Sequence, residues 1–474
     1  MCHCYFEQKP DITGKHPAEA YRVAGKENIE WAVKKGLCLG CGTCINVCPQ
    51  DAINMFETPG GLLLAEVNSS KCNGCGLCLK CCPGTHLEQG LLTSEVDPFK
   101  GNEVAAYLGQ ATDPRILSEG QSGGVVTALL CHLLDSGRIH RTVVTQMPDD
   151  GSLRPKPVTT ADRAVIQKAQ GSKYCPVAVN AVIPKGLDDG EKIAVVGLPC
   201  HIHGIHNVQS QLGRWQDLFT IGLVCERILA FGAIDHLINK AGLCRSDVAY
   251  FRFKSKLLGG WLGDVCIRTR DGAVHRVANK QRMLIKDVYT PLRCRLCFDK
   301  LNVLSDLVVG DPWGIRKDKE GLSIIITRTD RAKDVLLSAE NAGRLRLESV
   351  EPDVVFRGQK VERKRQDWAA FTEARMQAGG LVPEFHIDKR WVADVREIQL
   401  KPYRHKLEWA HSLSGKSGVS EVLKAARRKL AFQKLRWNLT PKRWTGFLSR
   451  CFARLKGRSP QSAMQSSHRT GADY

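Results

Sequence analysis

The stretch "CLGCGTCINVCP" spans residues 38–49, and "CNGCGLCLKCCP" repeats its spacing at residues 72–83. Each stretch carries the pattern C-x-x-C-x-x-C-x-x-x-C-P. In this ferredoxin spacing, three thiolates hold one iron–sulfur cluster and the fourth reaches the other cluster of the pair. Zinc ribbons and unligated thiols are alternatives, but the duplicated spacing with both prolines favours clusters. The repeat therefore predicts two [4Fe–4S] clusters, one on Cys38, Cys41, Cys44 and Cys82 and the other on Cys72, Cys75, Cys78 and Cys48.

The composition narrows the class of protein. A chain of 474 residues exceeds what one hydrophobic core normally supports, so we expect several domains. Hydrophobic residues make up 43% of it, with no apolar run long enough to span a membrane. The N-terminal stretch lacks the features of a secretory signal. The twenty cysteines are therefore expected to be metal ligands in a reducing cytoplasm rather than disulfides.

The net charge of +20 is concentrated near the C-terminus. Between residues 401 and 458, sixteen Lys or Arg side chains stand against only Glu408 and Glu421. Apolar residues such as Trp437 and Trp444 recur among them, as in basic amphipathic helices. We expect a helical extension that either lies on an anionic membrane surface, at the inner face of the membrane, or packs on the body or an acidic partner such as ferredoxin. Nucleic-acid binding is suggested by charge alone and is disfavoured by the ferredoxin cysteines.

Between these two ends, short β-rich runs alternate with helical patterns. Strands are predicted at 104–109, 141–147, 192–199, 218–225, 306–310 and 323–329, and helices at 125–134 and 331–343. This alternation predicts an α/β region, in two lobes with a break near 184–190. The expected fold is an α+β ferredoxin-like module, then a larger α/β flavin-binding region and a basic helical C-terminal extension. The expected boundaries are 1–35 for a lead, 36–90 for the ferredoxin module, 103–185 and 190–355 for the α/β parts, and 380–474 for the extension.

Three stretches of the α/β region carry candidate chemistry. Ser122, Gly123 and Gly124 precede the helical pattern at 125–134, where glycines and helix N–H groups suit a phosphate; taken alone, the stretch favours the alternative of a Ser-capped helix after a glycine turn. The "GSKY" stretch at 171–174 offers a cation and an aromatic ring in Lys173 and Tyr174. In "VVGLPCHIHGI" at 195–205, Cys200 opens a helix, whose dipole is expected to acidify the thiol.

Taken in order, these stretches resemble a known family. The ferredoxin module, "SGGVVTALL", "GSKY", "GLPCHIHG", "GLVC", "CRLC" and "SDLVVGDPWG" together resemble the coenzyme F420 hydrogenase/dehydrogenase beta-subunit family over about residues 36 to 355. Members of that family are flavoproteins with iron–sulfur clusters, and they include subunits that pass electrons to or from the deazaflavin coenzyme. The resemblance implies an FAD site built partly from Ser122–Gly124, Lys173 and Tyr174. Asp311, after the strand at 306–310, is expected either to bind the flavin or to cap the next turn.

Four further cysteines sit in family-like motifs: Cys200, Cys225, Cys294 and Cys297. Strand ends and a loop can bring such scattered thiolates to one face of an α/β region, so we predict a third [4Fe–4S] cluster. Buried packing thiols and a zinc site are the alternatives. The nearby histidines His201, His203 and His206 do not line one helical face, which favours structural or cluster-shielding roles.

This inventory of cofactors predicts a function. A flavin accepts a hydride and releases electrons singly, so it joins hydride chemistry to one-electron clusters. We expect an oxidoreductase moving electrons between [4Fe–4S] clusters, FAD and a redox partner such as ferredoxin or coenzyme F420. The alternative is a non-catalytic electron-transfer subunit of a larger redox complex. The catalytic residues, the substrate and the direction of electron flow are not determined by the sequence.

Overall fold

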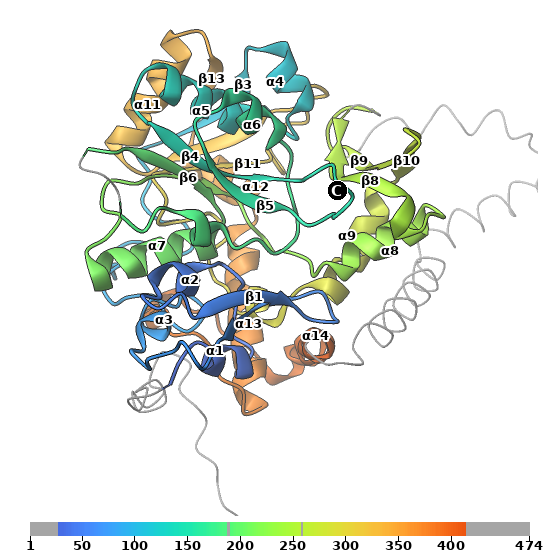
Figure 1. The fold of residues 1–474 in the computed structure, drawn as a ribbon. Helices are drawn as coiled ribbons and strands as arrows, with labels where there is room; N and C mark the ends of the chain where they lie inside the picture. The colour runs from blue at the N-terminus through green and yellow to red at the C-terminus, as the bar shows by residue number, and fades with distance from the viewer. Residues whose placement is uncertain (1–26, 187–189, 257–258, 414–474) are drawn as a thin grey trace, which may run out of the picture. The chain divides into compact units, whose positions relative to one another are not determined.

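The computed structural model describes residues 27–186, 190–256 and 259–413 (Figure 1). The chain divides into two compact units, Met1–Val422 and Leu423–Tyr474. The second unit lies wholly outside the described residues, so the architecture below is that of the first. The part of the predicted basic extension at residues 414–474 is likewise outside them.

The ferredoxin module is built from very short elements: α1 Glu30–Lys34, α2 Thr43–Val47, β1 Ile53–Glu57, β2 Leu63–Val67 and α3 Leu77–Lys80. The strands β1 and β2 pair antiparallel. Each cysteine-bearing helix, α2 and α3, follows a glycine with positive φ, Gly42 at 85° and Gly76 at 73°. Glycine adopts this left-handed conformation without steric cost. The chain can therefore turn sharply within each C-x-x-C-x-x-C run, so that its three thiols can approach one cluster.

An eight-stranded sheet forms the α/β region. Its strands are β3 Ala105–Ala111, β4 Arg141–Gln146, β5 Lys156–Thr160, β6 Ile193–Gly197, β7 Phe219–Leu223, β11 Leu307–Gly310, β12 Ser323–Thr327 and β13 Leu345–Val350. Their order is β13-β3-β12-β11-β7-β6-β4-β5. Four consecutive strands, β11, β7, β6 and β4, run parallel. The outer neighbours pair antiparallel. All of the strands and helices that the sequence predicts in this region are present.

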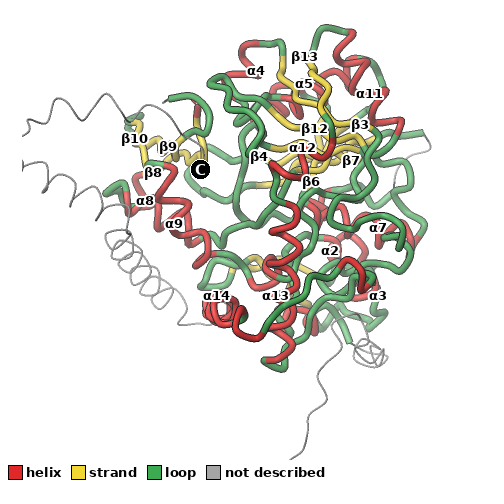
Figure 2. The backbone as a smooth tube through the Cα atoms, turned by 180° about the vertical axis from the view of Figure 1, so that it is seen from behind, coloured by secondary structure: helices red, strands yellow, loops and turns green. Residues whose placement is uncertain are grey.

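Helices cover both faces of this sheet (Figure 2). One apolar core packs α4 Pro114–Glu119, α5 Val125–Asp135, α6 Arg163–Lys168 and α11 Asp330–Asn341 against the sheet. Two further cores use α7 Pro199–Leu212, α12 Pro352–Gly358 and α13 Val361–Gln377. Successive strand residues point to opposite faces, so Tyr107 joins the first core and Leu108 another. Burial on both faces explains why the strand sequences are continuously apolar.

The two parts of the chain on either side of the predicted break near 184–190 share one sheet. Strand β6, which follows this segment, lies between β7 and β4, and β3 from the first half lies between β12 and β13. Strands from both halves therefore interleave in one sheet. They share the same apolar cores, because neighbouring strands bury their side chains together.

A three-stranded antiparallel sheet is inserted between β7 and β11, beside the helices α8 and α9 (Figure 1). The insertion comprises α8 Gly232–Lys240, β8 Val248–Ser255, β9 Asp264–Thr269, β10 Val274–Val277, α9 Asn279–Tyr289 and α10 Leu292–Arg295. One short 3-10 helix, η3 Arg245–Asp247, lies within the insertion, and others occur elsewhere in the chain at η2 Val179–Val182, η5 Lys389–Trp391 and η6 Glu397–Gln399. The predicted strands did not include this insertion, since its polar, half-buried strands lack a strong apolar run.

The described C-terminal part packs on the ferredoxin module. Phe371 of α13 and Leu407 of α14 Lys401–Ser412 share an apolar core with Ile29, Ala32 and Leu79 of the module. Two backbone hydrogen bonds reinforce this contact. Leu87 N–H donates to the Glu384 carbonyl, and Glu384 N–H donates to the Thr85 carbonyl. The helix α14 of the predicted basic extension is therefore part of the folded body of the protein. Among the helices that the structure describes, none is both long and apolar enough to span a membrane.

Candidate iron–sulfur and flavin sites

The first group of ferredoxin thiols joins residues from both motifs. Burial, followed by the neighbouring thiols of Cys41 and Cys38, raises the pKa of Cys82 to about 12. The pKa of Cys44, on α2, lies well above its ordinary value because of burial and of the thiols of Cys41, Cys38 and Cys82. The last cysteine of the second motif therefore lies with the first three of the first motif. These four are the residues that the spacing assigns to one cluster.

The second group of ferredoxin thiols joins one cysteine of the first motif to cysteines of the second. Burial is the main reason why the pKa of Cys78 rises to about 11, and the thiols of Cys75 and Cys48 add to it. Cys48, which ends the first motif, thus lies with the cysteines of the second. Cys75 is exposed and Cys72 is half-buried, so this group lies nearer the surface than the buried Cys41. The extra thiol, Cys81, instead packs in an apolar core.

A third group of thiols assembles from three separate elements. Cys200 is the second residue of α7, Cys225 follows β7, Cys294 lies on α10, and Cys297 comes three residues later. Burial raises the pKa of Cys200 well above its ordinary value, and Cys41, Cys225, Cys294 and Cys297 raise it further. The fold therefore brings together the four cysteines of the predicted third cluster. The ligand assignment itself stays a prediction.

The expectation that the helix dipole acidifies Cys200 is wrong for the protein without a bound metal. The thiol is at the first turn of α7 as expected, but burial, followed by the neighbouring thiols, raises its pKa well above the ordinary value. Removing a thiolate from water costs more than the partial charge of a helix end returns. A metal ion or cluster reverses the balance, because it supplies the positive charge that holds thiolates deprotonated.

The donor set fits cubane clusters better than a single ion. Zinc draws its ligand atoms to within about 2.0–2.3 Å of one point. Within residues 27–186, 190–256 and 259–413, no three His, Cys, Asp or Glu side chains form a group that could hold one metal ion. A [4Fe–4S] cluster is held by four cysteine thiolates, each on its own iron atom, so its ligands need not converge on one point.

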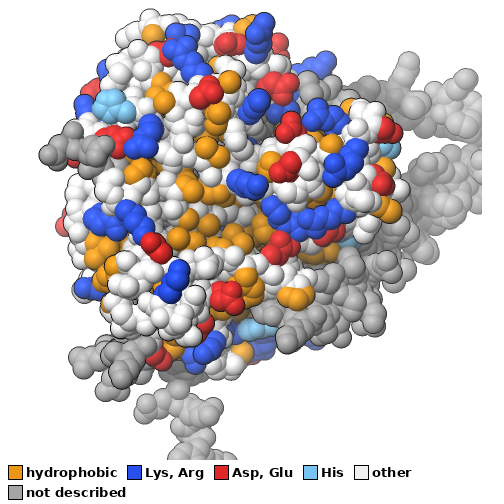
Figure 3. Space-filling model, in the orientation of Figure 1, with side chains coloured by type: hydrophobic (Ala, Val, Ile, Leu, Met, Phe, Trp, Pro, Cys, Tyr) orange, Lys and Arg blue, Asp and Glu red, His pale blue; other side chains and the backbone are white. Residues whose placement is uncertain are grey.

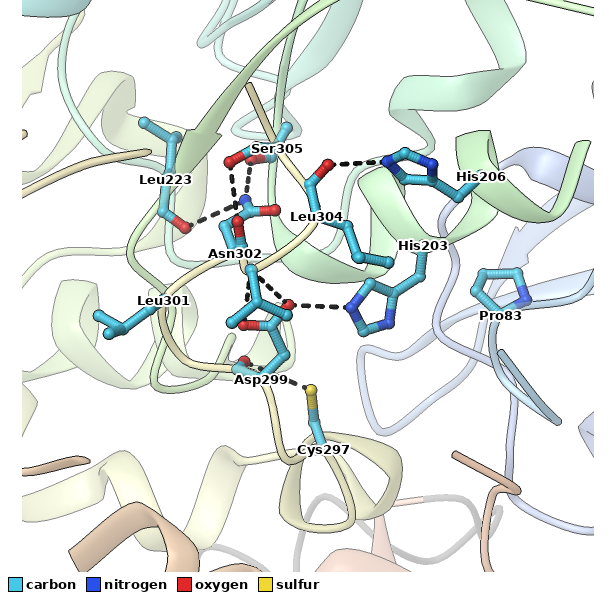
Figure 4. A network of polar contacts seen from close by, with 12 residues as sticks. Pro83, His203, His206, Leu223, Cys297, Asp299, Leu301, Asn302, Leu304 and Ser305 are labelled. Atoms are coloured by element: carbon cyan, nitrogen blue, oxygen red, sulfur yellow. Dashed lines mark hydrogen bonds and ion pairs between the residues drawn. The ribbon is translucent and has the colours of Figure 1, made fainter. Parts of the chain in front are cut away.

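The three histidines of α7 have other partners, several of which are drawn in Figure 4. His203 contacts the Asp299 carboxylate at 2.9 Å, and His206 contacts the Leu304 carbonyl oxygen at 2.7 Å. His201 lies 3.0 Å from the carbonyl oxygen of Val177. Figure 4 shows His203 between Asp299, two residues after Cys297, and Pro83, which follows Cys82. These contacts agree with the structural role that the sequence favours.

Asp311 and Tyr174 meet in a polar and aromatic cluster. The Lys254 ammonium donates to Asp311 Oδ2 at 2.7 Å, and Trp261 Nε1 donates to Asp311 Oδ1 at 3.3 Å. Gln121 Nε2 reaches both Tyr174 Oη, at 3.3 Å, and Asp311 Oδ2, at 3.5 Å. Although burial alone would lower it, Tyr174 and Asp311 raise the pKa of Lys254. Asp311 is thus a partner of a buried ammonium, a role that neither sequence alternative included.

The Ser122–Gly124 loop is hydrogen-bonded to the end of β3 and the start of β12. Gly123 N–H donates to Ser323 Oγ at 2.9 Å, and the Gly123 carbonyl accepts from Ala111 N–H at 2.7 Å. A Cβ on Gly123 would lie 2.3 Å from the Gly109 carbonyl oxygen. Ser122 Oγ donates to the Leu322 carbonyl. Glycine at 123 is therefore required by packing against β3 and β12, and a contact with flavin phosphates stays a prediction.

A cavity of about 110 Å³ lies at the carboxyl ends of β4, β6 and β7. Its lining includes Val126 and Thr127 from the first turn of α5, together with Ser172 and Lys173. Burial, aided by the Arg252 guanidinium, lowers the pKa of Lys173 to about 7. On the face seen in Figure 3, hydrophobic side chains gather across the middle, with Lys and Arg around them. In open α/β sheets, ligands bind at this edge of the parallel strands.

The predicted flavin residues therefore fall into two places. Lys173 lines the cavity, whereas the next residue, Tyr174, faces the cluster around Asp311. Sequence reasoning missed Gln121, Lys254 and Trp261, which hold that cluster together. Gln121 directly precedes the Ser122–Gly124 loop, for which the sequence predicts flavin contacts. Lys254 and Trp261 lie in an insertion without a recognisable motif.

Comparison with known proteins gives three matching family models. Residues 106–184 match the model described as coenzyme F420 hydrogenase/dehydrogenase, beta subunit N-term, and residues 190–353 match the model of its C terminus. The chain belongs to this beta-subunit family. Residues 37–85 match a 4Fe-4S dicluster domain. The family resemblance seen in the sequence is thereby confirmed, and iron–sulfur clusters belong to the ferredoxin module.

Several curated relatives share this family. A coenzyme F420-dependent sulfite reductase from Methanocaldococcus jannaschii is 26% identical over 67% of this chain, which spans about half, 48%, of that protein's length. One subunit of the F(420)H(2) dehydrogenase of Methanosarcina mazei is 25% identical over 71% of this chain and 92% of its own length. The beta subunit of the coenzyme F420 hydrogenase of Methanosarcina barkeri is 25% identical over 54% of this chain and 85% of its own.

A solved structure is also similar. One chain of the F420-reducing [NiFe] hydrogenase complex of Methanosarcina barkeri has a TM-score of 0.48 and 23% identity. The match covers 59% of this chain and 95% of that one.

The family models end at residue 353, so α13 and α14, which hold the ferredoxin module against the body, lie beyond them.

Proposed function

We propose that this protein is an iron–sulfur and FAD-dependent oxidoreductase that moves electrons between its clusters and a hydride carrier such as coenzyme F420. The single observation that carries the proposal is the proximity of Cys41 and Cys200. Cys41 belongs to the ferredoxin module, and Asn180 donates both to the Cys41 carbonyl, at 3.0 Å, and to the carbonyl of His201, the residue after Cys200, at 2.8 Å. The ferredoxin thiols and the third group of thiols are therefore adjacent, as a chain of redox centres requires.

The order of the proposed centres follows from exposure. The group containing Cys75 lies at the surface, where an external electron carrier such as ferredoxin can approach it. The group containing Cys41 is buried, with Cys41 itself 7% exposed. The proposed third cluster is ligated by Cys200, Cys225, Cys294 and Cys297. Electrons would pass from the surface group through the buried group to the third cluster, or in the reverse direction.

FAD is the proposed cofactor between the clusters and the carrier. When bound, a flavin supplies the exchange between a hydride and single electrons. The first turn of α5 offers N–H groups to a phosphate, and Ser172 and Lys173 line the cavity beside it. The cavity, at about 110 Å³, is smaller than the roughly 300–1,000 Å³ typical of ligand sites. These residues therefore fit a part of FAD.

The central experiment measures iron in a double variant. Cys294→Ser with Cys297→Ser should remove about one third of the bound iron and leave the electron paramagnetic resonance (EPR) signals of the ferredoxin module intact. Cys244→Ser is the matched control, because Cys244 is an exposed thiol outside all three groups. Unchanged iron content in the double variant would refute the third cluster. Flavin released from the anaerobically purified chain, identified by its absorption and mass, tests the FAD assignment.

A second candidate function is electron transfer within a larger complex. Two of the relatives are named as subunits, of a dehydrogenase and of a hydrogenase, and this chain spans only about half of the sulfite reductase. The purified chain would then carry clusters yet show no turnover by itself. A screen with reduced coenzyme F420, NAD(P)H and reduced ferredoxin as donors separates the two candidates, since only the first predicts reduction of an artificial acceptor by the chain alone.

A further inference from the structure

A short chain of buried polar groups crosses the contact between the ferredoxin module and the α/β region. Cys41 Sγ lies 3.3 Å from Thr43 Oγ1, and Asn180 Nδ2 donates to the same Thr43 oxygen at 2.9 Å. Asn180 belongs to η2, 137 residues away in the sequence. Thr43 and Asn180 are both 0% exposed. Water therefore does not compete for these hydrogen bonds.

The orientation of the Asn180 amide is fixed by a second contact. Asn180 Nδ2 also donates to the backbone carbonyl of His201 at 2.8 Å. A carbonyl oxygen only accepts, so the NH₂ end of the amide must face it. Asn180 Oδ1 has no hydrogen-bond partner in the described part of the chain. Both amide protons of Asn180 are thus in use, one on His201 and one on Thr43.

This arrangement decides where the Thr43 proton points. A hydroxyl carries one proton and two acceptor lone pairs. Asn180 occupies an acceptor position of Thr43 Oγ1, which leaves the Thr43 proton free to donate. A cysteine thiolate can only accept, and Cys41 Sγ is within hydrogen-bond distance. The Thr43 hydroxyl therefore donates to Cys41 whenever Cys41 is a thiolate ligand.

Backbone packing holds the three residues together. Asn180 N–H donates to the Cys41 carbonyl at 3.0 Å. A Cβ at Gly204 would lie 2.2 Å from Thr43 Oγ1, and a Cβ at Gly42 would lie 2.7 Å from the backbone nitrogen of Ala181. Only glycine at these two positions permits so close an approach. The contact is therefore built into both sides of the interface.

We propose that Thr43 and Asn180 are positioning residues that raise the reduction potential of the cluster ligated by Cys41, so that the α/β region sets the potential of a ferredoxin cluster. The proposal rests on the proposed function, in which Cys41 is a cluster ligand. A reduced cluster carries one more negative charge, and a hydrogen bond donated to its sulfur stabilises that charge. Asn180 bonds the carbonyls of both Cys41 and His201, the residue after Cys200, so the adjusted cluster is the one nearest the proposed third cluster.

The test is an EPR-monitored redox titration of the anaerobically purified full-length chain. Thr43→Val keeps the shape of the side chain and removes the hydroxyl. We expect one cluster signal of this variant to titrate at a lower potential, with the other signals unchanged. Thr43→Ser retains the hydroxyl and should titrate like the unaltered chain. Thr372→Val is the matched control, because Thr372 is buried in α13 and its hydroxyl has no partner among the described residues.

A second variant tests the contribution of the α/β region. Asn180→Leu removes the donor and leaves Thr43 in place, so the hydroxyl can turn away from Cys41. We expect the same cluster signal to shift in the same direction, by less than in Thr43→Val. A role of Asn180 in packing alone would lower the amount of folded protein without moving the potential of the cluster that remains.

Two results would overturn the proposal. The first is a Thr43→Val chain with full iron and sulfide in which every cluster keeps its original potential. The second, decisive where Thr43→Val fails to assemble its clusters, is an Asn180→Leu chain with unchanged potentials. Iron and sulfide in the unaltered chain are measured first. Their absence there would overturn the proposed function, whereas normal clusters with unshifted variants refute the hydrogen-bond chain only.

Discussion

Lys254 Nζ lies 2.7 Å from Asp311 Oδ2, and this ion pair joins the inserted three-stranded sheet to the end of β11. The side chains are 1% and 10% exposed. Removing one partner of such a pair leaves an uncompensated buried charge. We expect Lys254→Met to lower the free energy of unfolding by about 3–5 kcal/mol, measured by urea denaturation under anaerobic conditions.

The matched control for that prediction is an exposed ion pair. Arg316 and Glu348 lie 2.6 Å apart with side chains about half exposed, 48% and 52%. Arg316→Met should cost less than about 1 kcal/mol. Adding Asp311→Leu to Lys254→Met should recover part of the loss, because the isolated carboxylate is then gone. Equal effects of Lys254→Met and Arg316→Met would contradict the buried pair.

Cys82 and its neighbour Cys81 test the exchange of ligands between the two ferredoxin motifs. Cys82 lies with Cys38 and Cys41, whereas Cys81 packs in an apolar core. Cys82→Ser should alter or remove the EPR signal of one ferredoxin cluster. Cys81→Ser should keep the iron content and cost only packing energy. Iron loss from Cys81→Ser with none from Cys82→Ser would reverse the assignment.

Gly123 is predicted to be intolerant of any side chain, whether or not flavin binds. A Cβ there would lie 2.3 Å from the Gly109 carbonyl oxygen and 2.9 Å from the Ser323 nitrogen. We expect Gly123→Ala to lower the free energy of unfolding by at least about 1–3 kcal/mol, the usual cost of overpacking. A Cβ at Gly186 would meet nothing within 4 Å, so Gly186→Ala should stay within about 0.5 kcal/mol. Equal stability of both variants, measured by thermal unfolding, would argue against the packing explanation.

Lys173 should make stability depend on pH. Its pKa is lowered to about 7 by burial and by Arg252, whereas an unfolded chain holds the proton up to a pKa of about 10.4. Between these two pKa values the unfolded state binds more protons than the folded state, so the contribution of Lys173 to the free energy of unfolding rises with pH in this range. That contribution correspondingly decreases as pH falls toward 7. The difference in unfolding free energy between the unaltered chain and Lys173→Met should rise by up to about 1.4 kcal/mol per pH unit, less where solvent reaches the half-buried side chain. A difference that stays constant from pH 7.5 to 9 contradicts the lowered pKa.

The basic extension should be tested by truncation after Leu413. Deletion from Lys401 would also remove α14, whose Leu407 and Ala410 are buried against the ferredoxin module. A chain ending at 413 should keep its iron and lose any sedimentation with anionic vesicles, because most of the excess positive charge lies beyond that point. Salt should weaken vesicle binding of the full-length chain. If the full-length chain does not sediment with anionic vesicles at low salt, docking of an acidic partner replaces the membrane interpretation.

Local patterns explain which predictions could be made without coordinates. The apolar runs around Val195 and Ile325 identify buried strands, because side chains in a strand alternate between two covered faces. The interleaving of β3 and β6 into one sheet could not be predicted, since strand order depends on pairing between distant segments. The three-stranded insertion was missed for a related reason. Its strands are stabilised by pairing with each other and by α8 and α9 rather than by a strong apolar pattern.

The sequence by itself determined the ferredoxin ligand pattern, because the ligands of a cubane cluster are mostly close in the chain and their spacing is a local property. The tertiary structure decided everything that depends on distant residues meeting. It brought Cys41 beside Cys200, Asn180 onto Thr43 across 137 residues, and Lys254 onto Asp311 across 57. Each of these contacts depends on how α7, η2 or β8 packs against another element. Packing of that kind arises from the burial of side chains over the whole fold, and no short stretch of sequence specifies it.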